Sequence, residues 1–251
     1  MKISIITVCF NSSKTIRDTI ESVLSQDYSD IEYIIVDGGS TDGTLEIIND
    51  YIDSVSILIS EPDRGIYDAM NKGIQLATGE VIATLNSDDV YADNSSIRKL
   101  LTCMENNGTE TVFADLVYVD QNDSEKIIRY YNSGNFNPAK LRYGWIPAHP
   151  TFLAKRALFD KWGLYSLDYQ IAADFEMMVR LFYVAKISYT YLPEVVVNMR
   201  IGGISTGGLR NSWLLNKEIV RACKMNGIKT SLPRVLMKIP AKLFEYVRRP
   251  E

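Results

Sequence analysis

The sequence is poor in the residues that build covalent, redox and zinc sites. Its 251 residues include three cysteines and one histidine, and none of these are spaced as in a zinc site. Isolated thiols favour a reducing compartment. The chain also has no run of the roughly 18 apolar residues that a membrane span requires, and its first residues lack the architecture of a signal peptide. We therefore expect a cytoplasmic protein.

The sequence also lacks an excess of basic residues. Lys and Arg number 27 against 31 Asp and Glu, a net charge of −4, so we expect no nucleic-acid partner. The charge is unevenly divided, because residues 209–251 carry ten Lys or Arg against three Glu and the first 208 residues carry a net −11. This division predicts an acidic body over 1–208 and a basic helical extension over 209–251.

Short apolar runs alternate with helix-like stretches through the first ninety residues. The runs span residues 3–8, 31–36, 55–59 and 81–85. Apolar residues recur at helical spacing over 16–24, 45–52 and 66–77. This alternation predicts an α/β fold in which a mixed, mostly parallel sheet lies between helices.

Beyond residue 90 the pattern is less regular. We expect helices over 97–104 and 173–184, and strands over 111–119 and 126–131. The body is therefore divided into two halves, residues 1–90 and residues 91–208.

Polar and acidic residues follow the predicted strands at their carboxyl ends. Asp37 follows the second run, and Asn86, Ser87, Asp88 and Asp89 follow the fourth. In a parallel sheet these ends meet at one edge, where ligand crevices form. Adjacent carboxylates repel one another unless a cation lies between them, and Mg²⁺ and Mn²⁺ prefer oxygen ligands. The edge is therefore a candidate site for a metal-held diphosphate, with a solvated, helix-capping turn as the alternative.

Several motifs taken together resemble glycosyltransferase family 2 with the GT-A fold. They are Ile-Ile-Thr-Val-Cys-Phe-Asn at 5–11, Glu-Ser-Val-Leu-Ser-Gln at 21–26, Val-Asp-Gly-Gly-Ser-Thr-Asp-Gly-Thr at 36–44 and Leu-Asn-Ser-Asp-Asp at 85–89. A block at 61–73, Glu-Pro-Asp-Arg-Gly-Ile-Tyr-Asp-Ala-Met-Asn-Lys-Gly, is similar to members that build bacterial cell-surface polysaccharides. The likeness runs from residue 1 to about 205, and it implies that 1–90 bind a nucleotide and 91–208 an acceptor.

The resemblance implies roles for residues at the predicted edge. Thr7, Val8 and Asn11 would line the nucleotide pocket. Asp37 would contact the base, and Arg64 would lie near the uridine and the diphosphate. The implied donor is a nucleotide sugar, a UDP-sugar in the first instance.

The same resemblance implies a divalent cation, Mn²⁺ or Mg²⁺, at Asp88 and Asp89. Asp88 matches the last acid of the family's Asp-x-Asp metal motif, and Asp89 matches the acid that follows it. Asn86 stands where many members have the first Asp, and with Ser87 it is expected to face the nucleotide. Because Asn keeps an oxygen but loses a charge, we expect weaker metal binding than in those members.

A catalytic base is implied at the start of the helix expected from residue 173. Asp174 matches the place of the family's base, and Glu176 is the rival. Glu176 lies two positions on, about 200° around the helix, so the two carboxylates cannot share one face. Sugar transfer with inversion needs a group that takes the acceptor's proton, and Asp174 is our candidate, with helix capping as the alternative.

Four further residues are expected on the acceptor side. His149, the lone histidine, and Trp145 lie in the irregular stretch that faces the acceptor by resemblance; a core role is the alternative for both. Glu176 is a secondary candidate. Arg200 opens a glycine-rich segment, 200–208, that is either a lid over the substrates or a linker.

Together these features predict a metal-dependent, inverting glycosyltransferase with a saccharide or lipid-linked saccharide acceptor. A polyprenyl-phosphate sugar transferase, a non-catalytic sugar-nucleotide binding module and, less well matched, a nucleotidyltransferase are the alternatives. The basic extension predicts attraction to an anionic membrane surface, at the inner face of the cell membrane, with a solvated extension or an oligomer contact as the alternative.

Overall fold

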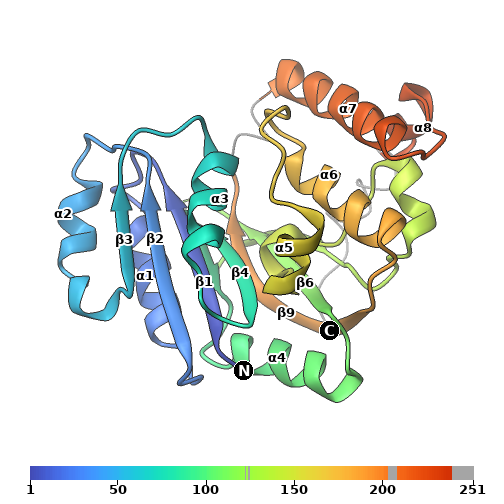
Figure 1. Cartoon of the computed structure of the whole chain (residues 1–251). Coiled ribbons are helices and arrows are strands. Elements are labelled where there is room, and N and C mark those ends of the chain that lie inside the picture. The colour runs from blue at the N-terminus through green and yellow to red at the C-terminus, as the bar shows by residue number, and fades with distance from the viewer. Residues whose placement is uncertain (122, 124, 203–207, 239–251) are drawn as a thin grey trace.

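A mixed sheet of nine strands runs through the described part of the molecule, which comprises residues 1–121, 123, 125–202 and 208–238 of a computed structural model (Figure 1). The strand order is β3-β2-β1-β4-β8-β6-β9-β5, and β7 pairs with β6. The strands are β1 (Ile3–Cys9), β2 (Ile31–Asp37), β3 (Ile57–Ser60), β4 (Val81–Asn86), β5 (Asp89–Tyr91), β6 (Thr111–Val119), β7 (Ile127–Tyr131), β8 (Leu153–Lys155) and β9 (Tyr189–Arg200).

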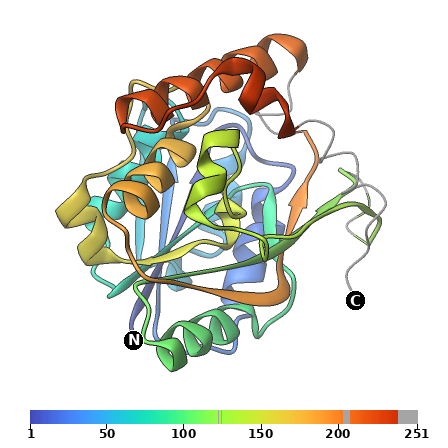
Figure 2. The ribbon, with the colours of Figure 1, turned by 90° about the vertical axis from the view of Figure 1, so that its right-hand side faces the viewer.

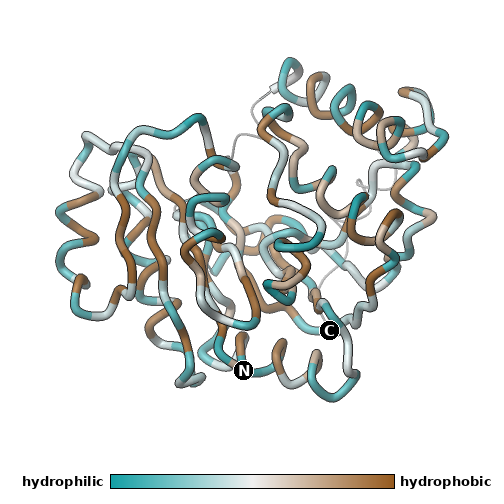
Figure 3. Tube along the Cα trace, viewed as in Figure 1, coloured by the Kyte–Doolittle hydropathy of each residue, from teal (hydrophilic) through white to brown (hydrophobic). Residues whose placement is uncertain are grey.

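The first four strands form the parallel half of the sheet that the sequence predicts. Their side chains alternate between two hydrophobic layers: Ile34 and Val36 pack on one face, and Tyr33 and Ile35 on the other. In Figure 3 the strands β2 and β3, in the left part of the view, are brown over much of their length. Burial on both faces explains why these strands have nearly continuous apolar sequences.

Helices cover both faces of the sheet. The α-helices are α1 (Ile16–Leu24), α2 (Thr44–Asn49), α3 (Ile66–Leu76), α4 (Ser96–Asn107), α5 (Arg156–Trp162), α6 (Ala173–Val179), α7 (Gly208–Met225) and α8 (Leu232–Leu236). Short 3-10 turns span Ile52–Ser54, Pro138–Tyr143 and His149–Thr151. α3, α5, α6 and α7 contribute to one hydrophobic layer, and α1, α2 and α4 to the other.

The second half of the sheet is mixed. β8 joins β4 to β6 in antiparallel pairings, while β9 runs parallel to β6 and antiparallel to β5. The sequence patterns did not predict β5, β8 or β9, because two of them have three residues and β9 contains Pro193. The helix expected over 173–184 is present, but its last turn, Arg180–Val184, is a π-helix.

The C-terminal helices pack against the body. Ile219, Ala222 and Cys223 of α7 and Val235 of α8 are buried in the layer that includes α6. α7 lies above α6 in both Figure 1 and Figure 2. Among the described residues, no helix is long and apolar enough to cross a bilayer. Residues 239–251 of the predicted extension lie outside the described part.

Candidate active site

Three neighbouring strands bring the predicted edge residues to one place. β1, β2 and β4 run parallel, so their carboxyl ends lie side by side. Cys9 is paired in register with Asp37, and Val8 with Asn86. The turns that follow these three strands therefore surround a common site, as expected for a sheet of this kind.

Asp37 organises the turn after β2. Its buried carboxylate accepts hydrogen bonds from the backbone N–H groups of Gly39 (3.1 Å) and Ser40 (3.0 Å) and from the hydroxyls of Ser40 and Ser60 (2.7 Å for Ser60). Burial would raise the pKa of Asp37, but these hydrogen bonds lower it below its ordinary value. The group is therefore ionised at pH 7 and holds the turn in place.

Side-chain hydrogen bonds join the turns after β1, β2 and β4. The backbone N–H of Asn11 donates to the Ser40 hydroxyl (2.7 Å), and its Oδ1 accepts from the N–H of Thr41 (2.9 Å). Asn11 has a φ of 49°, which Asn tolerates better than most residues. The hydroxyls of Ser12 and Ser87 are 2.8 Å apart. The edge is thus held in shape before any ligand binds.

Phe10 is an edge residue to which the motifs assigned no role. Its side chain is 62% exposed, and Gly38 lies so close that an added Cβ there would be 3.4 Å from Phe10 Cδ2. Thr7 and Val8 are buried, and the Thr7 hydroxyl accepts a hydrogen bond from Tyr33 (3.1 Å). Neither of these two side chains is accessible to a ligand. An exposed aromatic residue directly after an apolar strand is the signal that points to Phe10.

Asp88 lies between β4 and β5, and Asp89 is the first residue of β5. Asp89 is fully buried; its Oδ2 accepts a hydrogen bond from Asn86 Nδ2 (3.3 Å), and its Oδ1 has no partner among the described residues. Burial raises the pKa of Asp89 well above its ordinary value, and the charge of Asp88 raises it further. Burial also raises the pKa of Asp88. The charge of Arg200 lowers both pKa values, but it does not offset the effect of burial.

Arg200 is the basic residue that the structure brings to this pair. It ends β9, its side chain is 11% exposed, and it donates to the backbone carbonyl of Asp88 (3.2 Å). Its guanidinium also forms an ion pair with Asp18 (2.5 Å). Most of the predicted lid, residues 203–207, lies outside the described residues.

The acidic pair fits a divalent cation that a diphosphate helps to bind. Among the described residues, no three His, Cys, Asp or Glu are grouped so as to hold a metal by themselves. Mg²⁺ in nucleotide sites usually takes only one or two carboxylates, with phosphate oxygens and water completing its shell. The unpartnered Oδ1 of Asp89 and the partly exposed carboxylate of Asp88 suit that arrangement.

Asp174 lies at the start of α6 in a cluster of aromatic side chains. Its Oδ1 accepts a hydrogen bond from the N–H of Phe175 (2.7 Å) and is 3.3 Å from the Tyr67 hydroxyl. That hydroxyl donates to the carbonyl of Ile171 (2.6 Å), and the Tyr67 ring stacks on Tyr165 at 5.7 Å. The carboxylate is thus oriented by its surroundings while it remains partly exposed.

His149 links this cluster to the sheet. Its Nε2 is 2.8 Å from the Tyr165 hydroxyl, and that hydroxyl also lies near Thr84 in β4. Since Thr84 precedes Asn86 by two residues, the Asp174 cluster rests on the strand that ends at the acidic pair. Burial lowers the pKa of His149, against the charge of Asp174, which raises it. The imidazole is therefore largely neutral at pH 7.

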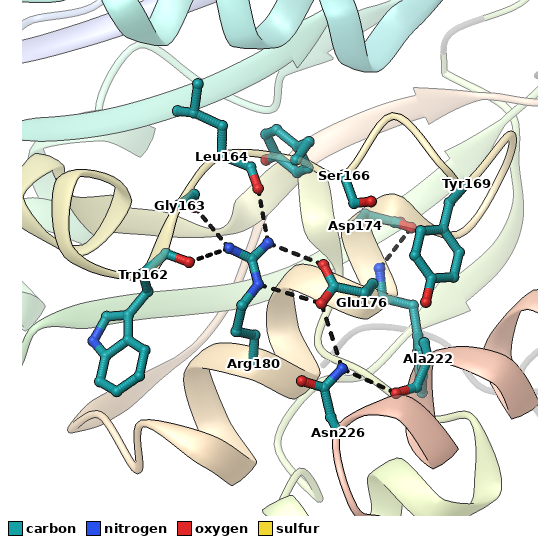
Figure 4. A network of polar contacts seen from close by, with 12 residues as sticks. Trp162, Gly163, Leu164, Ser166, Tyr169, Asp174, Glu176, Arg180, Ala222 and Asn226 are labelled. Atoms are coloured by element: carbon teal, nitrogen blue, oxygen red, sulfur yellow. Dashed lines mark hydrogen bonds and ion pairs between the residues drawn. The ribbon is translucent and has the colours of Figure 1, made fainter.

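Glu176 belongs to a separate ion-pair network (Figure 4). Its carboxylate pairs with Arg180 (2.9 Å), and Arg180 also donates to the backbone carbonyls of residues 162–164. Asn226 donates to the same carboxylate (3.4 Å). These contacts hold the end of α5 against α6.

Trp145 and Arg64 differ in accessibility. Trp145 is stacked on the partly buried Tyr131 and on the core residue Phe136, with centroids 6.0 and 6.1 Å away. Arg64 follows β3; its side chain is 76% exposed and forms an ion pair with Asp68 (3.1 Å). Arg64 is the more accessible to a ligand.

The sequence matches the family described as Glycosyl transferase family 2 over residues 4–166, which is more than half of the chain. The protein belongs to glycosyltransferase family 2. It is 29% identical to a "PGL/p-HBAD biosynthesis glycosyltransferase" of Mycobacterium tuberculosis, over 89% of this chain and 84% of that protein. It is 30% identical to an uncharacterized glycosyltransferase of M. tuberculosis, over 71% of this chain and 68% of that protein.

Two solved structures of low sequence identity share the fold of this glycosyltransferase. Staphylococcus aureus TarS 1-349, in complex with UDP-GlcNAc, superposes with a TM-score of 0.70 at 16% identity, covering 97% of this chain and 72% of that one. The mannosyltransferase PcManGT of Pyrobaculum calidifontis, in complex with GDP-Man and Mn²⁺, gives 0.62 at 16% identity, covering 99% and 81%. The predicted GT-A fold is confirmed.

Proposed function

We propose that this glycosyltransferase moves a sugar from a UDP-sugar to a saccharide or lipid-linked saccharide, with inversion, in the synthesis of a cell-surface polysaccharide. The observation that carries the proposal is that two groups of residues lie next to β4. The acidic pair Asp88–Asp89 follows its carboxyl end. Tyr165, whose ring stacks on Tyr67 beside Asp174, lies near Thr84 of the same strand. A leaving diphosphate and an acceptor hydroxyl would meet between them.

The donor side would use the turns after β1 and β2. The exposed ring of Phe10 offers a stacking surface for a base. The Asp37 carboxylate is buried under the turn, so it would accept the base N–H in addition to the hydrogen bonds of Ser40 and Ser60. Asp88 and Asp89 would hold Mn²⁺ or Mg²⁺. The cation would neutralise charge on the leaving diphosphate. The TarS complexes with UDP and UDP-GlcNAc support a uridine donor, and the PcManGT complex supports a divalent cation.

On the acceptor side, Asp174 would act as general base. Its carboxylate would take the proton of the acceptor hydroxyl while that oxygen forms a bond to the sugar's anomeric carbon and the bond to the diphosphate breaks. The hydroxyl of Tyr67, 3.3 Å away, would keep the carboxylate oriented. A polyprenyl-phosphate acceptor would leave these roles unchanged, so it remains the alternative for the acceptor.

A screen of nucleotide sugars with and without Mn²⁺ tests the proposal. We expect metal-dependent binding of UDP by calorimetry and slow release of UDP from one UDP-sugar. Asp88→Ala should weaken the metal-dependent binding, whereas Asp50→Ala, at an exposed ion pair with Arg17, should not. Binding without any release of UDP would instead favour the non-catalytic module.

We also propose that the basic extension attracts the chain to the inner face of the cell membrane. Lys217 and Lys224 are exposed on α7, as is Trp213, which is 49% exposed. Such a surface suits anionic lipid headgroups. The chain should sediment with vesicles that contain phosphatidylglycerol, and replacing Lys242, Arg248 and Arg249 with Gln should reduce this. Failure of the wild-type chain to sediment with these vesicles would contradict membrane binding, and equal sedimentation of both chains would show that these three residues do not contribute to it.

A further inference from the structure

Glu218 is a buried acid in α7, outside every motif that the sequence singled out. It is 6% exposed. Its carboxylate accepts three backbone hydrogen bonds, from the N–H groups of Gln170 (2.8 Å), Ile171 (2.9 Å) and Ala172 (2.9 Å). Hydrogen bonds to an ionised acceptor are roughly twice as strong as neutral ones. A single side chain therefore fixes three successive residues.

The segment that Glu218 holds leads directly into the proposed base. Ala172 precedes α6, and Asp174 is the second residue of that helix. The carbonyl of Ile171 also accepts the hydrogen bond from Tyr67, whose hydroxyl lies beside Asp174. A shift of residues 170–172 would therefore move both the helix start and its tyrosine contact.

α7 holds the preceding residues of this segment as well. Arg221 donates to the carbonyl of Asp168 (3.2 Å), and its guanidinium lies over the Tyr169 ring (4.9 Å). The Tyr169 hydroxyl reaches the sulfur of Met225 (3.7 Å). The whole stretch 168–172 is thus fastened to the C-terminal helix.

We propose that Glu218 is a positioning residue, which sets the place of Asp174 by holding residues 170–172. This inference rests on the proposed role of Asp174 as base. It gives the C-terminal extension a part in catalysis that is independent of any membrane. Positioning errors of about 1 Å can cost a reaction roughly 100-fold, so a small movement of this segment matters.

Glu218→Gln is the sharpest test, because it keeps the shape of the side chain. The NH₂ group of the glutamine side chain cannot accept a hydrogen bond. It would replace one carboxylate oxygen and so place a donor opposite backbone N–H donors. Hydrogen exchange at residues 170–172 should become faster. Release of UDP from a mixture of UDP-glucose, UDP-galactose and UDP-GlcNAc with Mn²⁺ should fall about 10- to 100-fold, while UDP affinity stays within twofold.

Asn226→Ala is the matched control. It also removes a side-chain bond between the α7 region and α6, to Glu176, but none to residues 168–172. Exchange at 170–172 and UDP release should stay near wild type. Unchanged exchange or unchanged UDP release in Glu218→Gln would overturn the inference, as would an equal loss in the control.

Failure of the proposed function would look different. If Asp174 is not the base, the Asp174→Asn variant should release UDP at the wild-type rate, whether or not Glu218→Gln changes that rate. Should Glu218→Gln fail to fold, Arg221→Met takes its place, because Arg221 is exposed and touches the same segment. Faster exchange at 170–172 with reduced UDP release would then support the inference, and wild-type behaviour would refute it.

Discussion

Two carboxylates on α6, two residues apart, have different surroundings. Asp174 is partly exposed beside the Tyr67 hydroxyl, whereas Glu176 is buried in its ion pair with Arg180. The helical period predicts that they point to different faces. Their difference in environment is what separates a candidate base from a structural residue.

Exchanging each acid for its amide tests this difference. Asp174→Asn should lower UDP release about 100-fold or more and leave UDP affinity unchanged, because the amide cannot take a proton. Glu176→Gln should instead lower the free energy of unfolding by about 2–3 kcal/mol, because it leaves the partly buried Arg180 without its counter-charge. Calorimetry of UDP binding and thermal denaturation of both variants provide the measurements. The reverse pattern would assign the base to Glu176.

The buried carboxylate of Asp89 lowers the stability of the metal-free chain, and a bound cation would remove this effect. Its Oδ1 is buried without a hydrogen-bond partner among the described residues, and its carboxylate is adjacent to Asp88. Asp89→Asn should therefore stabilise the metal-free chain by about 1 kcal/mol, which for this length corresponds to a rise in Tm of roughly 2–4 °C.

The same variant should lose metal-dependent UDP binding. Denaturation in EDTA at pH 7 and calorimetry with Mn²⁺ measure the two effects on one preparation. A destabilised Asp89→Asn chain would show that the buried charge is already compensated in the free protein.

At the scale of the elements, Glu32 joins the beginnings of β1, β2 and β4. It is 6% exposed and accepts hydrogen bonds from Lys2 Nζ (2.8 Å), the Ser4 hydroxyl (2.6 Å) and the N–H of Thr78 (2.7 Å). Burial by itself would raise the pKa of Glu32, but these bonds lower it from 4.5 to about 2. The folded state therefore prefers the ionised form.

Stability should depend on pH through this residue. Because the pKa is lower in the folded state, the stabilisation is present above about pH 4.5 and is lost as the pH falls through about 2. Glu32→Gln should lose about 2–3 kcal/mol of unfolding free energy at pH 7. Urea unfolding at pH 7 and pH 3 should show the gap between wild type and variant narrowing; a constant gap would contradict the role of the charge.

How much of the elements the sequence predicts depends on their periodicity. β1, β2 and β4 are apolar throughout and flanked by amphipathic helices, so their place and the meeting of their ends follow from the pattern. β9 does not follow, because Pro193 interrupts it; the pairing with β6 skips Pro193 and Glu194 between Leu192 and Val195. Its pairing partners are distant in the chain, and no local pattern encodes them.

The site divides in the same way. The carboxylates of Asp37, Asp88 and Asp89 can be assigned to one edge from strand order alone. The contacts around Asp174 cannot be assigned in this way, because they join residues that are far apart in the chain. Tyr67 lies 107 residues before Asp174, and Glu218 lies 46 residues after Ala172. Such contacts depend on how the helices pack, which the spacing within each helix does not fix.

At the scale of the whole molecule, α7 and α8 complete the hydrophobic layer over α6. The side chains of Ile219, Ala222, Cys223 and Val235 are at most 3% exposed. A chain that ends at residue 207 would leave their partners facing water. We expect this chain to aggregate or to lose cooperative thermal unfolding, together with UDP release. A soluble, cooperatively unfolding fragment would show that residues 1–207 form an independent domain.

The central claim is that the acidic pair at the end of β4 binds a cation that holds the diphosphate. A crystal of the chain with UDP and Mn²⁺, with the manganese located by its anomalous signal, tests this most directly. We predict a single manganese peak in contact with Asp88 and with the diphosphate, next to the turns after β1 and β2. UDP bound at this edge without manganese, or manganese and UDP bound elsewhere, would contradict the account.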